Sequence, residues 1–188
     1  SRGLGDVYKR QAIMFRMEEL ERTYLAKVLP EGLLESPSKE MVDIYLPASA
    51  VHPHLRIRKA GEKYEITNKQ PVIKGDASRQ IESTIVLTSE EFGDLNLIPG
   101  KRVLKKRYYH TFEGRIYEVD VFEGQLSGLV LVDIEFESNE DKLAFLAPDF
   151  CLAEVTQEDF IAGGMLAGAR YEDVEIGLAK FRYKKIIL

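Results

Sequence analysis

Apolar and polar residues alternate with a period of two along most of the chain, which is typical of strands that bury one face. Short connections such as Gly61-Glu62 and Phe112-Glu113-Gly114 separate neighbouring runs, and connections this short favour an antiparallel meander. The pattern predicts eight strands, over Glu19–Lys27, Met41–Leu46, Leu55–Lys59, Lys63–Lys69, Gln80–Leu87, Arg102–His110, Arg115–Phe122 and Leu129–Glu137.

Helix signals stand between and after the predicted strands. Thr88-Ser89-Glu90-Glu91 matches a capping box, and Ser138 and Thr156 are suitable N-cap residues. Together they predict an α+β fold: an eight-stranded antiparallel β-barrel, closed or nearly closed because closure removes exposed edges, with helices packed outside. The expected helices run from Thr88 toward Leu97, from Ser138 to before Pro148, from Thr156 to near Gly168, and over Glu172–Phe181.

One face of nearly every predicted strand is charged, whereas the opposite face is apolar. Like charges recur two residues apart, about 6.5–7 Å along the same face, where they repel one another. A water-exposed sheet face would explain any single strand, but repetition on so many strands indicates a ligand that compensates the charges. The polar faces comprise Glu19, Glu21, Thr23 and Lys27; Arg56 and Arg58; Glu65, Thr67 and Lys69; Glu82 and Thr84; Lys105, Arg107 and Tyr109; Glu118 and Asp120; and Asp133, Glu135 and Glu137.

The two kinds of charged pair suit two kinds of ligand. Paired carboxylates accept hard divalent cations such as Mg²⁺ or Mn²⁺. Arg-x-Arg and Lys-x-Arg pairs accept polyanions, because arginine offers a fork of donors and lysine a point charge. If both line the inner wall of one barrel, a phosphate chain would lie against the bases, with metal ions between it and the acids. The apolar outer face would then pack against the helices.

Composition narrows the class of partner. The chain has 188 residues and a formal net charge of −5, so it does not broadly attract nucleic acid or an anionic membrane. No apolar run reaches the roughly 18–20 residues that cross a bilayer. The single cysteine, Cys151, excludes an internal disulfide framework and is expected to be a buried apolar residue in a reducing compartment. We therefore expect a cytoplasmic protein, a monomer or homodimer, with a small-molecule partner.

Residues 1–11 differ from the rest of the chain in their sequence pattern. Residues 1–11 show no apolar period, and Asp6 to Gln11 back-translates to a sequence that resembles a transposon end used for preparing sequencing libraries. We expect this segment to derive from a sequencing adaptor, in which case translation would start at Met14 or Met17. The alternative is that the segment is a genuine disordered N-terminal arm. A single domain is expected over residues 17–188.

From Met17 onward the chain resembles the CYTH domains, also called triphosphate tunnel metalloenzymes. The resemblance rests on several short motifs that occur in the same order and at similar spacing. They are Glu19-Leu20-Glu21-Arg22-Thr23 (family pattern Glu-x-Glu-x-Lys), Leu55-Arg56-Ile57-Arg58, Lys69, Lys105-Lys106-Arg107-Tyr108, Tyr117–Gly124 (Trp-Glu-x-Asp-x-Phe) and Gly128–Glu135 (Gly-Leu-x-x-x-Glu-x-Glu).

The resemblance implies a divalent-metal-dependent phosphohydrolase that acts on a triphosphate compound inside the barrel: inorganic tripolyphosphate, thiamine triphosphate or a nucleoside triphosphate. The expected cofactor is Mg²⁺ or Mn²⁺. The side chains expected to carry this chemistry are Arg56, Arg58, Lys69, Lys105, Arg107 and Tyr109 for substrate binding; Glu19, Glu21, Glu118, Asp120, Asp133 and Glu135 for metal; and Glu21, Glu135 and Lys27 for catalysis.

The sequence departs from the family pattern at three places. Thr23 stands where the signature has lysine, with Lys27 on the same face four residues later; Glu82-Ser83-Thr84 has one acid where a second is expected; and Asp133 replaces glutamate. Two alternative functions stay open. One alternative is an adenylate cyclase of the same fold, which would release pyrophosphate and cyclic AMP from ATP. The other is a polyphosphate- or nucleotide-binding module with little turnover.

Overall fold

The computed structural model of the protein describes residues 15–188, so the expected adaptor segment lies outside the described residues. All eight predicted strands are present, and their bounds differ from those expected by a few residues at most. The strands are β1 (Phe15–Ala26), β2 (Ser38–Leu46), β3 (Leu55–Ala60), β4 (Lys63–Pro71), β5 (Arg79–Leu87), β6 (Lys101–Phe112), β7 (Arg115–Phe122), β8 (Val130–Phe136) and a short additional β9 (Cys151–Glu154).

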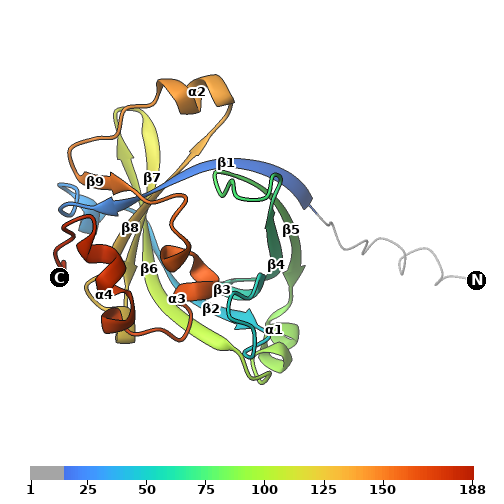
Figure 1. The fold of residues 1–188 in the computed structure, drawn as a ribbon. Helices are drawn as coiled ribbons and strands as arrows, with labels where there is room; N and C mark the ends of the chain where they lie inside the picture. The colour runs from blue at the N-terminus through green and yellow to red at the C-terminus, as the bar shows by residue number, and fades with distance from the viewer. Residues whose placement is uncertain (1–14) are drawn as a thin grey trace, which may run out of the picture.

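The first strand closes the barrel. The strand order is β5-β4-β3-β2-β6-β7-β8-β1-β9, and β1 also pairs with β5, so eight antiparallel strands form a ring. β1 pairs with β5 through its first half and with β8 through its second half, and β9 joins it near Ala26. In Figure 1, β1 runs along the top of the ring from β9 to β5. The predicted closed antiparallel barrel is confirmed.

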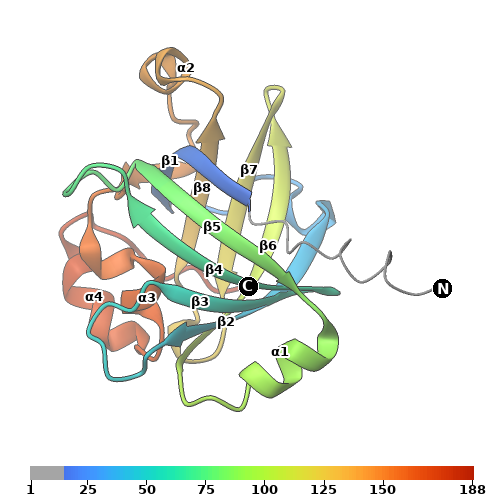
Figure 2. The ribbon, with the colours of Figure 1, turned by 90° about the vertical axis from the view of Figure 1, so that its right-hand side faces the viewer.

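The predicted meander is confirmed within two runs, β2 to β5 and β6 to β8, but not between them. β6 pairs with β2 rather than with β5, so the chain crosses over between the runs. That crossover contains α1 (Ser89–Leu95), which contacts β3 and β4. Figure 2 shows α1 beside the lower strands and α2 (Asn139–Ala144) beyond β7 and β8 at the opposite end of the view.

Local hydrogen bonds explain where the helices begin. Thr88 and Glu91 form the predicted capping box of α1, and the Ser138 hydroxyl accepts a bond from the Asp141 amide at the start of α2. α4 (Tyr171–Ala179) matches the predicted amphipathic helix. Within the described residues the short 3₁₀ turns are η2 (Leu33–Glu35), η3 (Gly124–Leu126) and η4 (Asp159–Ile161), and no helix is both long and apolar enough to cross a membrane.

The single helix expected from Thr156 is wrong. The segment instead forms η4 and the short α3 (Gly163–Leu166). Thr156 does not cap a helix, because its hydroxyl accepts a bond from the Thr23 amide of β1, and the Val155 amide donates to the Thr23 carbonyl. Tertiary pairing with β1 thus outweighs the local capping signal, and the two glycines of α3 have low helix propensity.

Apolar side chains gather in two places. One cluster lies on the outer face of β1, β7 and β8, beneath Phe145 and Phe150. The other lies inside one end of the barrel. Each strand residue of this cluster is two positions from a polar or charged residue of the inner face, and the cluster includes Leu166 of α3 and Leu178 of α4. The strand residues of this inner cluster are Leu25, Tyr45, Val103, Phe122 and Leu131.

The C-terminal segment therefore closes one end of the barrel with apolar packing. Close contacts explain the glycines there: a Cβ on Gly163 would lie 2.1 Å from the Tyr45 hydroxyl, and a Cβ on Gly164 would lie 2.3 Å from the Pro53 carbonyl oxygen. The charged lining predicted for the interior occupies the remaining length of the barrel.

Candidate active site

The strand register brings the predicted inner-face charges together. Arg107 of β6 stands opposite Asp120 of β7, and Glu118 of β7 stands opposite Asp133 of β8. Glu135 of β8 in turn stands opposite Glu21 of β1. The wall formed by β1, β7 and β8 is therefore rich in acids, and the cations come from β3, β4 and β6, where further acids on β2, β4 and β5 lie beside the two arginines of β3.

Arg107 is surrounded by carboxylates. Its Nε and Nη2 donate to the two oxygens of Asp120 at 2.6 and 2.7 Å, Nη2 also lies 3.1 Å from Asp133, and Nη1 contacts Glu118. Asp120 also accepts a bond from Lys105. Burial opposes ionisation of Asp120, but attraction to Arg107 and Lys105 outweighs it and lowers the pKa of Asp120 to about 2. Asp120 is therefore a buried anion.

Lys69 links the acids of β1. Its Nζ lies 2.9 Å from both Glu19 and Glu21, and Gln80 of β5 donates to the second oxygen of Glu21 at 3.0 Å. Burial raises the pKa of Glu21; attraction to Lys69 opposes this rise, and repulsion from Asp133 and Glu19 adds to it. Glu21 is therefore more easily protonated than an ordinary glutamate.

Glu135 lies beside the same acids but is more exposed to solvent. Its pKa is raised by partial burial and by repulsion from Glu118, Glu19 and Glu21. A raised pKa brings a carboxylate closer to the range in which it can accept a proton from water at neutral pH. Both predicted catalytic carboxylates therefore have this property.

The two arginines of β3 differ in their partners. Arg58 is buried and forms a fork with Asp43 of β2, with bonds of 2.6 and 2.7 Å. Arg56 lies 3.8 Å from Glu65 and 4.0 Å from Glu82. Its Nε is a buried side-chain nitrogen without a hydrogen-bond partner, and it is the one such atom found in the described part of the chain. A buried donor without an acceptor is costly, and a phosphate oxygen would satisfy it.

Two of the departures from the family pattern face each other. Thr23 and Asp133 are paired in the β1–β8 register, and the Thr23 hydroxyl donates to Asp133 at 2.7 Å. The other oxygen of Asp133 lies near Arg107. Arg107 thus supplies a positive charge at the level where the signature would have placed a lysine from β1.

Lys27 lies apart from the charged cluster, and its expected catalytic role stays a prediction. β1 ends at Ala26, and Lys27 is exposed beyond the buried Leu25 at the apolar end of the barrel. Asp120 also differs from the expected metal ligand, because its two oxygens are taken by Arg107 and Lys105. Tyr109 keeps the predicted inner-face position, opposite Glu118, and Lys39 lies 5.2 Å from its ring centroid.

The sequence reasoning missed Asp43 and Gln80. Asp43 stands out as the lone acid of the apolar run Met41–Leu46. Its parity places it on the inner face with Tyr45, and this signal could have identified it. Gln80 gave no comparable signal, because its contact with Glu21 depends on where β5 begins.

The acids of the barrel interior offer the type of ligand atom that binds a divalent cation. Among the described residues, no three His, Cys, Asp or Glu side chains are arranged to hold a metal ion. The donors are nevertheless carboxylate oxygens, which Mg²⁺ and Mn²⁺ prefer. Mutual repulsion among Glu19, Glu21, Glu118 and Glu135 is the electrostatic condition that a cation would relieve.

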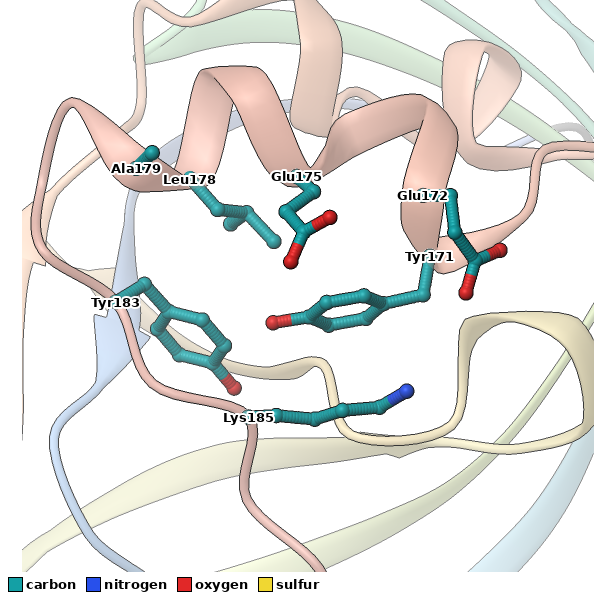
Figure 3. Close-up of a pocket in the computed structure, with 7 residues that line it drawn as sticks. All are labelled: Tyr171, Glu172, Glu175, Leu178, Ala179, Tyr183 and Lys185. Carbon is teal, nitrogen blue, oxygen red and sulfur yellow. The ribbon is translucent and has the colours of Figure 1, made fainter.

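A separate pocket lies on the outside, along α4 and the C-terminal segment. Figure 3 shows Lys185 passing beneath the ring of Tyr171, with Tyr183 beside it. The Lys185 Nζ lies 4.3 Å from the Tyr171 centroid. Glu172 and Glu175 also line this pocket, so its cation already has an aromatic partner and its other charges are negative. These features do not suit a polyanion.

Comparison with known proteins identifies a related triphosphatase. The chain is 35% identical, over 144 residues, to the inorganic triphosphatase of Nitrosomonas europaea, a match that covers 76% of this chain and 91% of the relative. The chain belongs to the inorganic triphosphatase family. No protein-family model matches it.

Two crystal structures related to this triphosphatase family are also similar to the fold. One, of an inorganic triphosphatase, has a TM-score of 0.59 at 30% identity and covers 80% of this chain and 95% of its own. The other, of a hypothetical protein, has a TM-score of 0.60 at 32% identity, and the match covers 81% of this chain and 99% of the chain in that structure. The barrel fold of this chain is therefore similar to that of a solved inorganic triphosphatase.

Proposed function

We propose that the protein hydrolyses inorganic triphosphate inside the barrel, with Mg²⁺ or Mn²⁺ as cofactor. Membership of the inorganic triphosphatase family supports triphosphate hydrolysis as the class of reaction. The observation that supports the assignment to this site is Arg56 on the inner face of β3, whose buried Nε has no hydrogen-bond acceptor. A phosphate oxygen would supply that acceptor.

The cations would bind the phosphates. Arg56 and Arg58 project from β3, Lys69 from β4, and Lys105 and Arg107 from β6, so they surround a chain of phosphates from three strands. In phosphoryl transfer, most of the catalysis is positioning and neutralisation of charge spread over the oxygens. Fixed cations in a confined, partly buried site supply both.

The acids would bind the metal ion and accept a proton from the attacking water. Glu19 and Glu118 are suitable ligands, with Glu21, Asp133 and Glu135 beside them. When bound, the divalent cation neutralises phosphate charge and orients the substrate. Glu21 or Glu135 would accept a proton from the water whose oxygen attacks the terminal phosphorus. The phosphoanhydride bond then breaks, and tripolyphosphate yields orthophosphate and pyrophosphate.

The closed end of the barrel bears on the choice of substrate. Leu25, Phe122 and Leu131 pack with Leu166 of α3 at that end, so we expect the substrate to enter and leave at the other end. Such a site would favour a short linear triphosphate over a long polyphosphate. The name of the Nitrosomonas relative also favours the inorganic substrate over ATP or thiamine triphosphate.

A substrate panel tests the proposal. Tripolyphosphate, ATP and thiamine triphosphate would each be mixed with the protein and Mg²⁺ or Mn²⁺, and the products identified. We expect metal-dependent orthophosphate with tripolyphosphate as the preferred substrate, and no product from a Glu19→Ala/Glu21→Ala variant. Cyclic AMP and pyrophosphate from ATP would instead indicate the cyclase. Thermal stabilisation by tripolyphosphate without any turnover would indicate the binding module.

A further inference from the structure

Asp43 occupies an unusual position for an acid. It lies on β2, whose other inner-face neighbours Met41 and Tyr45 are buried and largely apolar, and it is 1% exposed. The β2–β3 register places it directly opposite Arg58. A buried carboxylate is stable only if it is paired and hydrogen-bonded, and Arg58 provides both.

The pairing fixes the arginine in one orientation. Arg58 Nε donates to one oxygen of Asp43 at 2.6 Å, and Nη2 donates to the other at 2.7 Å. These two parallel bonds use one edge of the planar guanidinium, and such a fork restricts its rotation. Nη1 is on the opposite edge and is not part of the fork, so it is the nitrogen available to a further acceptor.

Asp43 also stabilises a crowded group of cations. It attracts Arg56 and Lys105 as well as Arg58, and Arg58 is repelled by Arg107. Without Asp43, these cations would repel one another with one fewer buried anion among them. The two ion pairs of Arg56, with Glu65 and Glu82, are long at 3.8 and 4.0 Å, so they fix its position less firmly than the fork fixes Arg58.

We propose that Asp43 is a positioning residue, which holds Arg58 so that its outer edge faces the phosphate chain beside Arg56. This inference rests on the proposed triphosphatase function. Asp43 does not contact substrate itself, because both of its oxygens are bonded to Arg58 and it carries the same sign of charge as phosphate. It acts through Arg58, which distinguishes it from the acids of the metal-binding wall.

The test is a cycle of Asp43→Asn, Arg58→Ala and the double variant, measured with tripolyphosphate and Mg²⁺. Asp141→Asn is the matched control, because Asp141 pairs with Arg115 outside the barrel. We expect Asp43→Asn to raise KM about tenfold, with a smaller change in kcat, because loss of a charge-assisted fork weakens the ground-state contact. In the Arg58→Ala background the same change should have no further effect on KM.

Several results would overturn the proposal. One is a KM for Asp43→Asn equal to that of Asp141→Asn, and another is an equal rise in KM with and without Arg58. If Asp43→Asn does not fold, Arg58→Ala and the double variant still decide: unequal KM values would show that Asp43 acts other than through Arg58. Failure of the proposed function can be told apart from failure of this inference alone, because the unsubstituted protein would then release no orthophosphate. In that case the role proposed for Asp43 would be wrong as well.

Discussion

Arg56 and Arg58 are two residues apart on one strand, yet their surroundings give them different roles. Arg58 is held by a buried acid, whereas Arg56 has long ion pairs and an unsatisfied Nε. The sequence pattern predicted both as phosphate contacts, but it could not show this difference, because Asp43 reaches Arg58 from another strand. Pairings between strands depend on register, which local sequence specifies only weakly.

Replacing Arg56 should separate binding from stability. Because its ion pairs are long and its buried Nε has no acceptor, Arg56→Gln should change the free energy of unfolding by only about 1 kcal/mol. The same change should raise KM for tripolyphosphate by about ten- to a hundredfold, since a charged hydrogen-bond donor to phosphate is lost. Urea unfolding and steady-state kinetics measure the two effects. A large loss of stability with unchanged KM would contradict this role.

Asp120 should matter chiefly for stability. Its pKa in the folded protein is about 2, below the ordinary value of about 3.9. A lowered pKa stabilises the fold above about pH 4, and this contribution is lost as the pH falls from about 4 toward 2. Asp120→Asn removes the negative charge that pairs with Lys105 and Arg107. It should therefore lower the free energy of unfolding by about 3–5 kcal/mol at neutral pH.

Denaturant unfolding between pH 2 and 7 checks this expectation. The fall in stability below about pH 4 should be smaller for Asp120→Asn than for the unsubstituted protein. Asp141→Asn, whose ion pair lies outside the barrel, serves as the comparison. If Asp120→Asn and Asp141→Asn gave the same pH dependence and the same stability, the buried network around Arg107 would not have the importance assigned to it.

At the level of elements, the period-two pattern predicted the strands well because each strand has one apolar and one charged face. The helices α1 and α2 were predicted by their caps, which are local interactions. The helix expected from Thr156 failed because the cap residue bonds to β1 instead. β9 was missed for a related reason: a strand of four residues gives little periodic signal and depends on pairing with β1.

Substitution by alanine should have opposite effects on thermal stability at two of the glycines. Gly93 lies within α1 with open space around it, so Gly93→Ala should raise the melting temperature slightly through helix propensity. At Gly164 an added Cβ would meet the backbone oxygen of Pro53, so Gly164→Ala should lower the melting temperature by several degrees. Differential scanning fluorimetry compares them. A neutral Gly164→Ala would mean that α3 does not pack closely against the end of the barrel.

For the whole molecule, the closed barrel and its charged interior could be predicted from the sequence, because like charges recur on one face of strand after strand. The closed end could not, since it depends on α3 and α4 folding back over the residues around Phe122 and Leu131. The sequence also placed Lys27 in the site, whereas β1 ends before that residue. A parity argument extends only as far as the strand does.

The most direct test of the proposed site follows tripolyphosphate by phosphorus NMR in the presence of the protein and Mg²⁺. We expect equal amounts of orthophosphate and pyrophosphate. Their formation should stop on adding a chelator and should be absent for Glu19→Ala/Glu21→Ala. Tripolyphosphate that stays intact with a folded protein and either metal, or hydrolysis that survives loss of both glutamates, would contradict the claim that the barrel interior is a triphosphatase site.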